Sequence, residues 1–192
     1  MGEKNGRTRT VTWEDPTAGA EVAKEMSGLE YLRAILRGEQ PAAPMAELLG
    51  FGFVEVEEGR AVFECVPAEY HYNPIGAAHG GLACTLADSA MGCAVHTTLP
   101  AGAGYTTLEI KINLLRPIMT ESGRLLCEGR VIHVGGRVAT AEARLTDEAG
   151  KLYAHATTTC MVFRGRRRSV RSARVEDNGD PPGHERPSPA TG

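Results

Sequence analysis

One stretch of this chain, residues 80–95, constrains the fold more than any other part of the sequence. It consists mostly of small apolar residues, contains no proline, and lies between segments rich in turn-forming residues. Arranged as a helix, it is apolar on nearly every side, which is typical of a helix buried on most of its surface. We therefore predict one long central helix that other elements must enclose.

Strand-like patterns lie on both sides of this helix. Residues 105–116 show a period of two, typical of a half-buried strand, with apolar Leu108, Ile110, Ile112 and Leu114 alternating with polar Thr107, Glu109, Lys111 and Asn113. Strands at 123–134, 137–146 and 151–163 follow at hairpin spacings, and residues 51–57 and 60–66 form another hairpin. The predicted class is α+β, with an antiparallel meander of long strands wrapped around one helix.

Polar segments precede and follow the predicted domain. Order is expected to begin at Ser27, because Ser27 and Glu30 have the spacing of a capping box and apolar residues follow at helical spacing. We expect residues 1–26 to form a loosely ordered extension and residues 27–164 to form the folded domain with its leading helix. Residues 165–192 are rich in arginine and proline, so we expect a disordered tail.

The composition excludes several classes of function. A net charge of −3 is not that of a protein built around nucleic acid, and no apolar stretch reaches the roughly 20 residues of a membrane span. The N-terminus lacks the apolar core of a secretory signal, so a cytoplasmic location is expected. The 5 cysteines are dispersed and predict reduced core residues, and the 6 histidines show no metal-ligand spacing.

Asp88 is the strongest candidate for chemistry, because no other acidic or basic side chain lies within residues 80–95. A carboxylate in an apolar interior must find a partner, contact water or have a raised pKa. The residues one helical turn away carry no positive charge that could pair with it. The simpler alternative is a helix face that meets solvent, but we favour a functional acid, since perturbed acids gather at active sites.

The predicted start of the same helix offers a second feature. His79, Gly80 and Gly81 lie where a turn becomes the helix N-terminus, and the backbone N–H groups there have no partner within the helix. Together with the helix dipole, such groups can hold an oxyanion or polarise a carbonyl. Glycine also lets a substrate approach the backbone closely, so this turn is a candidate binding site for a carbonyl oxygen.

Several motifs, taken together, resemble one known family. They are Asn-Pro-Ile-Gly-Ala-Ala-His-Gly-Gly at 73–81, Leu-Ala-Asp-Ser-Ala at 86–90, Thr-Leu-Glu at 107–109, Leu-Arg-Pro at 115–117 and Gly-Gly-Arg at 135–137. Their order and spacing resemble the hotdog-fold acyl-CoA thioesterases of the phenylacetate-pathway (PaaI) type. The resemblance covers about residues 44–163. It implies a hotdog fold, a homodimer paired edge to edge with each site between the protomers, and a homotetramer of two dimers.

The resemblance also implies roles for individual residues. Asp88 matches the catalytic carboxylate, which activates water or attacks the thioester carbon, and Gly81 matches the backbone donor to the thioester carbonyl. Asn73 and His79 match residues that line the carbonyl end of the site. For these two residues a structural alternative stays open: Asn73 could stabilise a turn before proline, and His79 could be held by the backbone.

Three further positions are matched. Thr107 occupies a position at which the partner subunit supplies a hydroxyl that places the water, and its alternative is an ordinary strand threonine. Gly136 and Arg137 match a position used against the phosphates of coenzyme A, since a fixed positive charge suits an anion. The alternative for Arg137 is an exposed arginine at the edge of a turn.

The predicted function is hydrolysis of an acyl-CoA thioester to the free acid and coenzyme A. It needs no metal and no separate cofactor, because coenzyme A is part of the substrate. An enoyl-CoA hydratase on the same fold is one alternative, with His79 and Asp88 as its paired His and acid. A non-catalytic acyl-CoA sensor is another, although residues 1–40 hold 6 basic and 7 acidic side chains and show no DNA-binding pattern.

Overall fold

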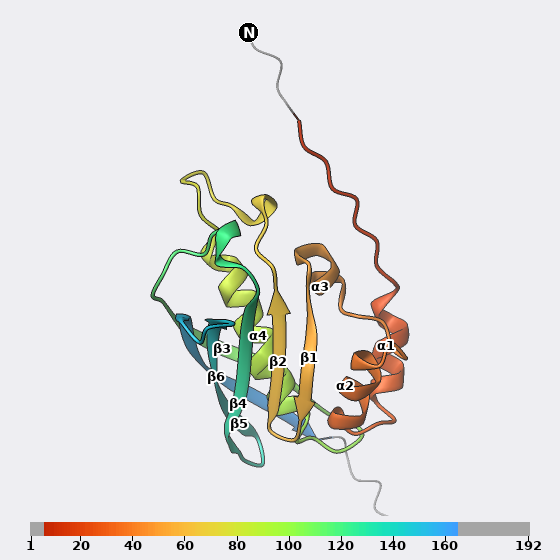
Figure 1. Cartoon of the computed structure of the whole chain (residues 1–192). Helices are drawn as coiled ribbons and strands as arrows, with labels where there is room; N and C mark the ends of the chain where they lie inside the picture. The colour runs from red at the N-terminus through yellow and green to blue at the C-terminus, as the bar shows by residue number, and fades with distance from the viewer. Residues whose placement is uncertain (1–5, 165–192) are drawn as a thin grey trace, which may run out of the picture.

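The structure, a computed structural model, describes residues 6–164 of the chain and places one long helix against one face of an antiparallel sheet (Figure 1). The helix, α4 (Gly80–His96), forms where the small apolar segment predicts it. The strands are β1 (Phe51–Glu57), β2 (Arg60–Cys65), β3 (Ala103–Leu114), β4 (Leu125–Val134), β5 (Val138–Asp147) and β6 (Leu152–Arg164). The predicted α+β class, a sheet around one central helix, is confirmed.

The order of the strands differs from the predicted meander. It is β1-β2-β4-β5-β6-β3, so β3 follows α4 in the chain but lies at the far edge beside β6. Strand β4 pairs with β2, on the other side of the sheet from β3. Helix α4 packs against one face of the sheet (Figure 1). The meander is therefore wrong for β3. The sheet has two edge strands, β1 and β3, which come from different parts of the chain.

Helix α4 packs on the sheet through the small residues that predicted its burial. Ala83, Leu86, Ala90 and Ala94 are 0% exposed and belong to the same apolar core as Cys127 and Ala139 on the sheet. The core cluster includes Cys65, Cys127 and Cys160, and all 5 cysteines are free. In the part of the chain that is described, no helix is both long and apolar enough to cross a membrane.

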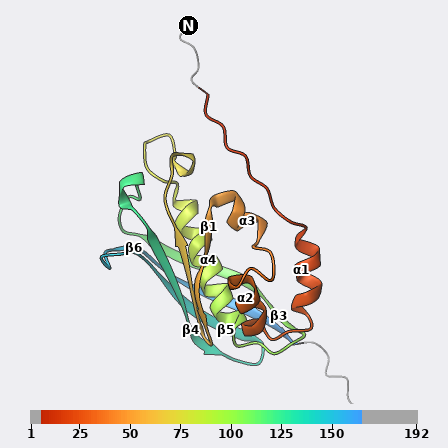
Figure 2. The ribbon, with the colours of Figure 1, turned by 45° about the vertical axis from the view of Figure 1, so that its right-hand side comes forward.

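Three helices precede the sheet: α1 (Pro16–Ala23), α2 (Gly28–Leu36) and α3 (Pro44–Leu49). Helix α2 begins at the predicted capping box, in which Ser27 and Glu30 each accept the other's backbone N–H. The loose order expected over residues 1–26 does not extend to residues 16–23, which form α1. This helix begins with Pro16, and the Thr17 N–H donates to the Asp15 side chain at 2.9 Å. Figure 2 shows α2 between α1 and α4. The predicted tail, residues 165–192, lies outside the described residues.

Strand β3 departs from strict alternation. Its pairing with β6 shifts register between Thr107 and Glu109, which is a β-bulge at Leu108. A shift of one residue moves the following side chains to the other face, so Thr107 faces α4 together with Ile110 and Ile112. Leu108, predicted on the buried face, is instead 53% exposed, whereas Leu114 keeps the face of Ile110 and Ile112 and is 54% exposed at the end of the strand. The predicted assignment of faces is therefore wrong on one side of the bulge.

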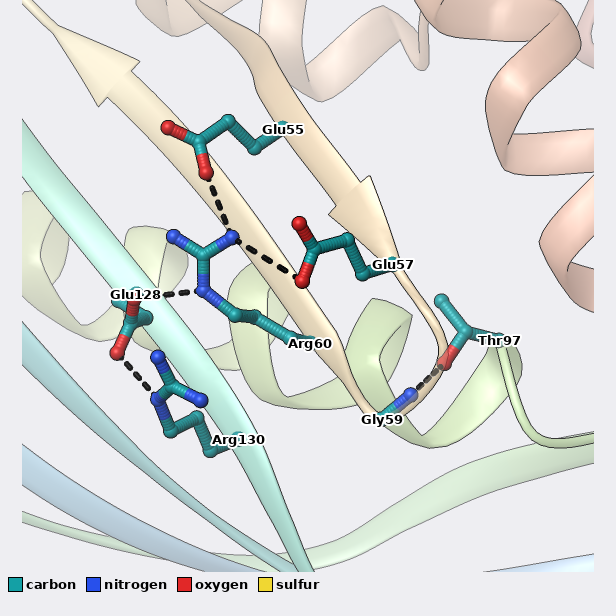
Figure 3. A network of polar contacts seen from close by, with 7 residues as sticks. All are labelled: Glu55, Glu57, Gly59, Arg60, Thr97, Glu128 and Arg130. Carbon is teal, nitrogen blue, oxygen red and sulfur yellow. Dashed lines mark hydrogen bonds and ion pairs between the residues drawn. The ribbon is translucent and has the colours of Figure 1, made fainter.

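The outer face of the sheet carries a charged network (Figure 3). Arg60 on β2 contacts Glu55 at 2.6 Å and Glu128 at 2.7 Å, and Glu128 also pairs with Arg130. At the tip of the β1–β2 hairpin, the Gly59 N–H donates to Thr97 Oγ1 at 2.7 Å, just after α4 ends. The Arg60 side chain is 17% exposed, and its acidic partners are more exposed. The network therefore forms a polar outer surface, opposite the face that packs on α4.

Candidate active site

Asp88 and Thr107 form the centre of the candidate site. Asp88 lies in the middle of α4, and the bulge in β3 turns Thr107 toward it. The Thr107 hydroxyl donates to Asp88 Oδ1 at 2.9 Å. Asp88 is half-buried, and its Oδ2 accepts no hydrogen bond from any described residue. One carboxylate oxygen is therefore held in place, while the other is available to a water molecule or a carbonyl carbon.

Thr107 and Asp88 belong to the same chain, which corrects one expectation. The resemblance implied that this hydroxyl comes from the partner subunit, whereas the bond between them forms within one protomer. The reason is the bulge at Leu108, because regular alternation would turn Thr107 away from α4 if Ile110 and Ile112 face it. The polar group that pairs with the Asp88 carboxylate is thus the Thr107 hydroxyl of the same chain.

The other predicted site residues gather at the N-terminal end of α4. His79 is the N-cap, and its Nδ1 accepts the Gly81 N–H at 2.9 Å. The Gly80 N–H, by contrast, has no hydrogen-bond partner in residues 6–164. Asn73 Oδ1 accepts the Ile75 N–H at 3.0 Å, which closes an Asx turn. Both bonds are of the structural kind named as the alternatives for His79 and Asn73, and of the two glycines only Gly80 has an N–H without a partner among residues 6–164.

The two groups of residues are separated within one chain. Gly80 precedes Asp88 by 8 residues, which corresponds to about 12 Å along the axis of an α-helix. A carbonyl oxygen that accepts a hydrogen bond at the helix N-terminus therefore lies far from the Asp88 carboxylate of the same chain. Gly80 lies instead beside Leu114, since a Cβ on Gly80 would be 2.7 Å from Leu114 Cδ1. Leu114 is the last residue of β3, and Thr107 lies 7 residues before it.

Gly136 and Arg137 lie in the turn between β4 and β5, at the same end of the sheet as Thr107. Thr107 pairs with Cys160, which pairs with Ala139, two residues after Arg137. The Arg137 carbonyl accepts the Val162 N–H at 2.9 Å, which fixes the backbone of the turn. The Arg137 side chain is exposed and makes no ion pair with a described residue. Its charge is therefore available to an anion.

A cavity of about 600 Å³ opens beside Asp88. Residues of α1, α2, α3, β1, β2, α4 and β3 line it, and among the described lining residues Asp88 is the only aspartate, glutamate, lysine or arginine. Sequence reasoning missed three aromatic residues in this lining: Tyr31, His96 and Tyr105. Their ring centroids lie 6.2 Å apart for Tyr31 and His96 and 5.6 Å apart for His96 and Tyr105.

The signal that could have found His96 and Tyr105 is a spacing on α4. Asp88, Gly92 and His96 recur at every fourth residue and therefore share one helix face. Gly92 leaves room for the Tyr105 ring, because a Cβ there would be 2.6 Å from the Tyr105 hydroxyl. Burial lowers the pKa of His96 and raises the pKa of Tyr105 well above its usual value, so both rings are uncharged at neutral pH.

Comparison with known proteins places this geometry in a family. Residues 75–154 match the model of the thioesterase superfamily. A Listeria monocytogenes protein named 1,4-dihydroxy-2-naphthoyl-CoA hydrolase is 28% identical over 123 residues, which cover 64% of this chain and 98% of that protein.

Two solved structures are also similar. A phenylacetic acid degradation-related protein of Ralstonia eutropha is 32% identical with a TM-score of 0.62, over 68% of this chain and 98% of that one. A Streptococcus mutans protein bound to acetyl-CoA is 30% identical with a TM-score of 0.55, over 60% and 90% of the two chains. Both matches span nearly the whole of the other protein at 30% identity or more. This chain therefore belongs to the thioesterase superfamily, with a hotdog fold of the PaaI type, and is a thioester hydrolase.

Proposed function

We propose that this protein hydrolyses an acyl-CoA thioester to the free acid and coenzyme A, in a site that two copies of the chain form together. The observation that carries the proposal is the Asp88–Thr107 pair, held at 2.9 Å beside an apolar cavity. The name of the Listeria relative and the acetyl-CoA bound to the Streptococcus protein support a coenzyme A thioester as the substrate.

The open edge of β3 explains how two copies complete the site. A two-fold axis between Ile110 and Lys111 would pair β3 with β3 of a second copy and set Thr107 opposite Leu114. Because Gly80 lies beside Leu114, this register brings the α4 N-terminus of one copy toward Asp88 of the other. A closed two-fold pairing therefore produces two identical sites. Association of two such dimers into a tetramer stays a prediction from the resemblance.

In this proposal the thioester carbonyl oxygen accepts the Gly80 N–H at the positive end of the α4 dipole. Gly80 takes the role expected of Gly81, because His79 Nδ1 already accepts the Gly81 N–H. Asp88 Oδ2 removes a proton from water, whose oxygen attacks the carbonyl carbon. The C–S bond then breaks, and the coenzyme A thiolate takes up the proton. Asp88 could instead attack the carbon itself and form an anhydride that water opens.

The remaining predicted residues have supporting roles. Thr107 orients the carboxylate, and His79 and Asn73 fix the turn that presents Gly80. Arg137, with Gly136 beside it, contacts the phosphates of coenzyme A as a fixed cation. No metal or separate cofactor takes part in this reaction, and the cytoplasmic location stays part of the proposal. An enoyl-CoA hydratase would need His79 as a base. Because His79 Nδ1 accepts the Gly81 N–H, the neutral ring carries its proton on Nε2 and has no free lone pair with which to take a proton from water.

The proposal is tested by Asp88→Asn, which keeps the size of the side chain and removes the base. Thiol release from acetyl-, octanoyl-, phenylacetyl- and palmitoyl-CoA should fall by about a thousandfold for the preferred substrate, with binding retained. Glu58→Gln, the same chemical change in an exposed turn, should leave turnover unchanged. Single-turnover hydrolysis in oxygen-18 water, with the enzyme in excess, separates the two mechanisms. General-base catalysis places the label in the released acid, whereas nucleophilic attack followed by opening of the anhydride at the Asp88 carbonyl places it in Asp88.

Three results would contradict the proposal. Unchanged turnover in Asp88→Asn would remove Asp88 from the chemistry. Binding of acyl-CoA without thiol release by the wild-type protein would indicate the acyl-CoA sensor. Addition of water to an enoyl-CoA, with no thiol release, would indicate the hydratase.

A further inference from the structure

The cavity beside Asp88 has a wall that lies outside the central sheet and helix. Ala20 and Ala23 on α1, and Tyr31 and Ile35 on α2, line it from one side. Phe53 on β1 and Cys93 on α4 line it from the other side. The segment from Pro16 to Leu49, which holds α1, α2 and α3, therefore encloses space that connects directly with the Asp88 carboxylate. We call this segment the leading segment.

The leading segment is fastened to the same helix that carries Asp88. The Gly28 N–H, at the start of α2, donates to the Leu99 carbonyl at 2.9 Å, three residues after α4 ends. A Cβ on Gly28 would be 1.8 Å from the His96 carbonyl oxygen, so only glycine permits this close approach. The wall formed by α2 thus has a fixed position relative to α4.

The shape of the cavity follows α4. Its lining includes Asp88 at one point of the helix and His96 at another, 8 residues later, which corresponds to about 12 Å along the axis. Pockets of about 300–1,000 Å³ hold drug-sized molecules, and this cavity measures about 600 Å³. A compact acyl group would leave much of this apolar space unfilled, whereas an elongated one would exchange water for apolar contact along its length.

The end of the cavity away from Asp88 is aromatic and uncharged. Tyr31 and His96 meet there, while the Tyr105 ring lies beside Gly92, midway between Asp88 and His96 on α4. No lysine or arginine among the described residues lines any part of the cavity. A second carboxylate on the acyl group would be taken out of water at this end without a cation to pair with it, which is costly. The lining therefore discriminates against an acyl group with a charged end.

We propose that the leading segment forms the outer wall of the acyl pocket, and that this pocket takes an elongated, uncharged and predominantly apolar acyl group lying along α4. The inference rests on the proposed function, because it places the thioester at Asp88. It assigns substrate selection to α1 and α2, and it places octanoyl and longer acyl chains among the preferred substrates, ahead of acetyl, phenylacetyl and dicarboxylic acyl groups.

The test fills the pocket from the leading segment. Ile35→Trp adds a large ring on the cavity face of α2, and Arg33→Trp adds the same ring on the exposed side of the same helix as the matched control. For Ile35→Trp, kcat/KM for octanoyl-CoA should fall about tenfold or more, while that for acetyl-CoA should stay within about threefold. Arg33→Trp should change neither value. Ala23→Phe fills the same space from α1 and guards against misfolding of the first variant.

The wild-type protein gives the second arm of the test. It should hydrolyse octanoyl-CoA with a higher kcat/KM than acetyl-, phenylacetyl- and suberoyl-CoA, the last of which has a carboxylate at the far end of a chain of similar length. Preference for acetyl- or phenylacetyl-CoA would overturn the inference, as would equal use of suberoyl-CoA. Loss of octanoyl-CoA turnover in Arg33→Trp to the same extent as in folded Ile35→Trp would also overturn it.

Failure of the proposed function gives a different result. If the wild-type protein hydrolyses none of these thioesters, calorimetry of octanoyl-CoA binding still tests the pocket. If Ile35→Trp abolishes binding and Arg33→Trp keeps it, the result supports the proposed acyl pocket and contradicts the proposed hydrolysis. Binding that neither variant changes would contradict the proposed acyl pocket.

Discussion

The two edges of the sheet differ in what covers them (Figure 1). At the β1 edge, α2 and α3 pack against the strand and enclose the cavity within one chain. At the β3 edge, no described residue pairs with the outer side of a strand that is 12 residues long. Exposed strand edges are templates for pairing with another chain, and proteins usually cover or interrupt them. The covered β1 edge therefore forms part of a pocket that one chain encloses, whereas the open β3 edge is free to pair with a strand of another chain.

The same division runs along α4. Its C-terminal half, with Asp88 and His96, faces the pocket that the leading segment closes. Its N-terminal turn, with the unpartnered Gly80 N–H, lies beside Leu114 near the open edge. Because the two halves are separated along one rigid helix, the chain supplies both parts of the chemistry but does not bring them together. In the proposed dimer, a second copy at the β3 edge resolves this separation.

Of the changes at the two edges, removal of the donor at the open edge is expected to have the largest effect. Gly80→Pro deletes the backbone N–H at the first helical position, where proline is well tolerated. Loss of one donor to a developing oxyanion should lower kcat by about a hundredfold or more. Gly80→Ala is the matched variant, because it keeps the N–H and adds only a Cβ near the flexible end of Leu114. Equal kcat values for the two variants would contradict a donor role for Gly80.

A smaller effect is expected from a charge on the open edge itself. Leu108→Asp places a carboxylate on the exposed bulge of β3, and Val66→Asp places one on an exposed apolar residue after β2. Leu108→Asp should weaken self-association about tenfold or more, with activity falling in parallel and recovering at high protein concentration. Light scattering with activity assays at several concentrations measures both. A dimer unaffected by Leu108→Asp, or equally weakened by Val66→Asp, would move the interface elsewhere.

At the covered edge, a substitution that disturbs the docking of α2 should lower the free energy of unfolding. Gly28→Ala forces α2 away from the His96 carbonyl, since the new Cβ would lie 1.8 Å from its oxygen. Overpacking of this kind costs about 1–3 kcal/mol of unfolding free energy. Denaturant unfolding measures the loss, and Gly38→Ala offers no such comparison because its φ is 73°. Gly52→Ala, in β1 with open space around its Cβ position, is the suitable control. A stability of Gly28→Ala equal to that of Gly52→Ala would show that α2 is not docked there.

The smallest effect concerns pH. His71 is buried beside the covered edge; its Nδ1 accepts the Ala68 N–H, so its Nε2–H donates to the Leu49 carbonyl at 2.7 Å. Burial lowers the pKa of His71 below the ordinary value of 6.5, with the charge of Arg9 acting in the same direction. The unfolded chain therefore binds a proton more readily than the folded one. Stability should be full above about pH 6.5 and decline as the pH falls toward the folded-state pKa.

Chemical unfolding at about pH 7.5 and about pH 5.5 tests this sign. His71→Gln should reduce the loss of stability between the two values, although its stability at the higher pH is lower. His133→Gln, the same substitution at an exposed histidine, is the matched control. An unchanged pH dependence in His71→Gln would contradict the account of its pKa.

Local patterns predicted the elements that local interactions determine. The burial of α4 follows from its own composition, and the start of α2 follows from Ser27 and Glu30, which bond to each other. The bulge at Leu108 could not be predicted from alternation, because pairing with β6 decides it. The same holds for the place of β3 at the edge of the sheet. Helix α1 does carry a local signal, the capping Asp15 followed by Pro16, and the prediction overlooked it.

For the site, the sequence located Asp88 by its charge in an apolar helix, and the resemblance supplied Thr107. It assigned the carbonyl donor to Gly81, whereas the hydrogen bond to His79 leaves Gly80 as the open position. The aromatic end of the pocket was missed, because Tyr31 and His96 come from helices whose contact depends on the close approach at Gly28. Contacts between segments that are distant in the chain could not be predicted from local patterns in a single sequence.

The central claim is that each site combines Asp88 of one copy with the α4 N-terminus of another. The most direct test mixes two inactive variants, Asp88→Asn and Gly80→Pro, after unfolding and joint refolding. Random pairing should restore about a quarter of the wild-type activity, because half of the dimers are mixed and each has one intact site. Activity in the mixture no higher than the average of the two separate variants would contradict the claim and place the whole site within one chain.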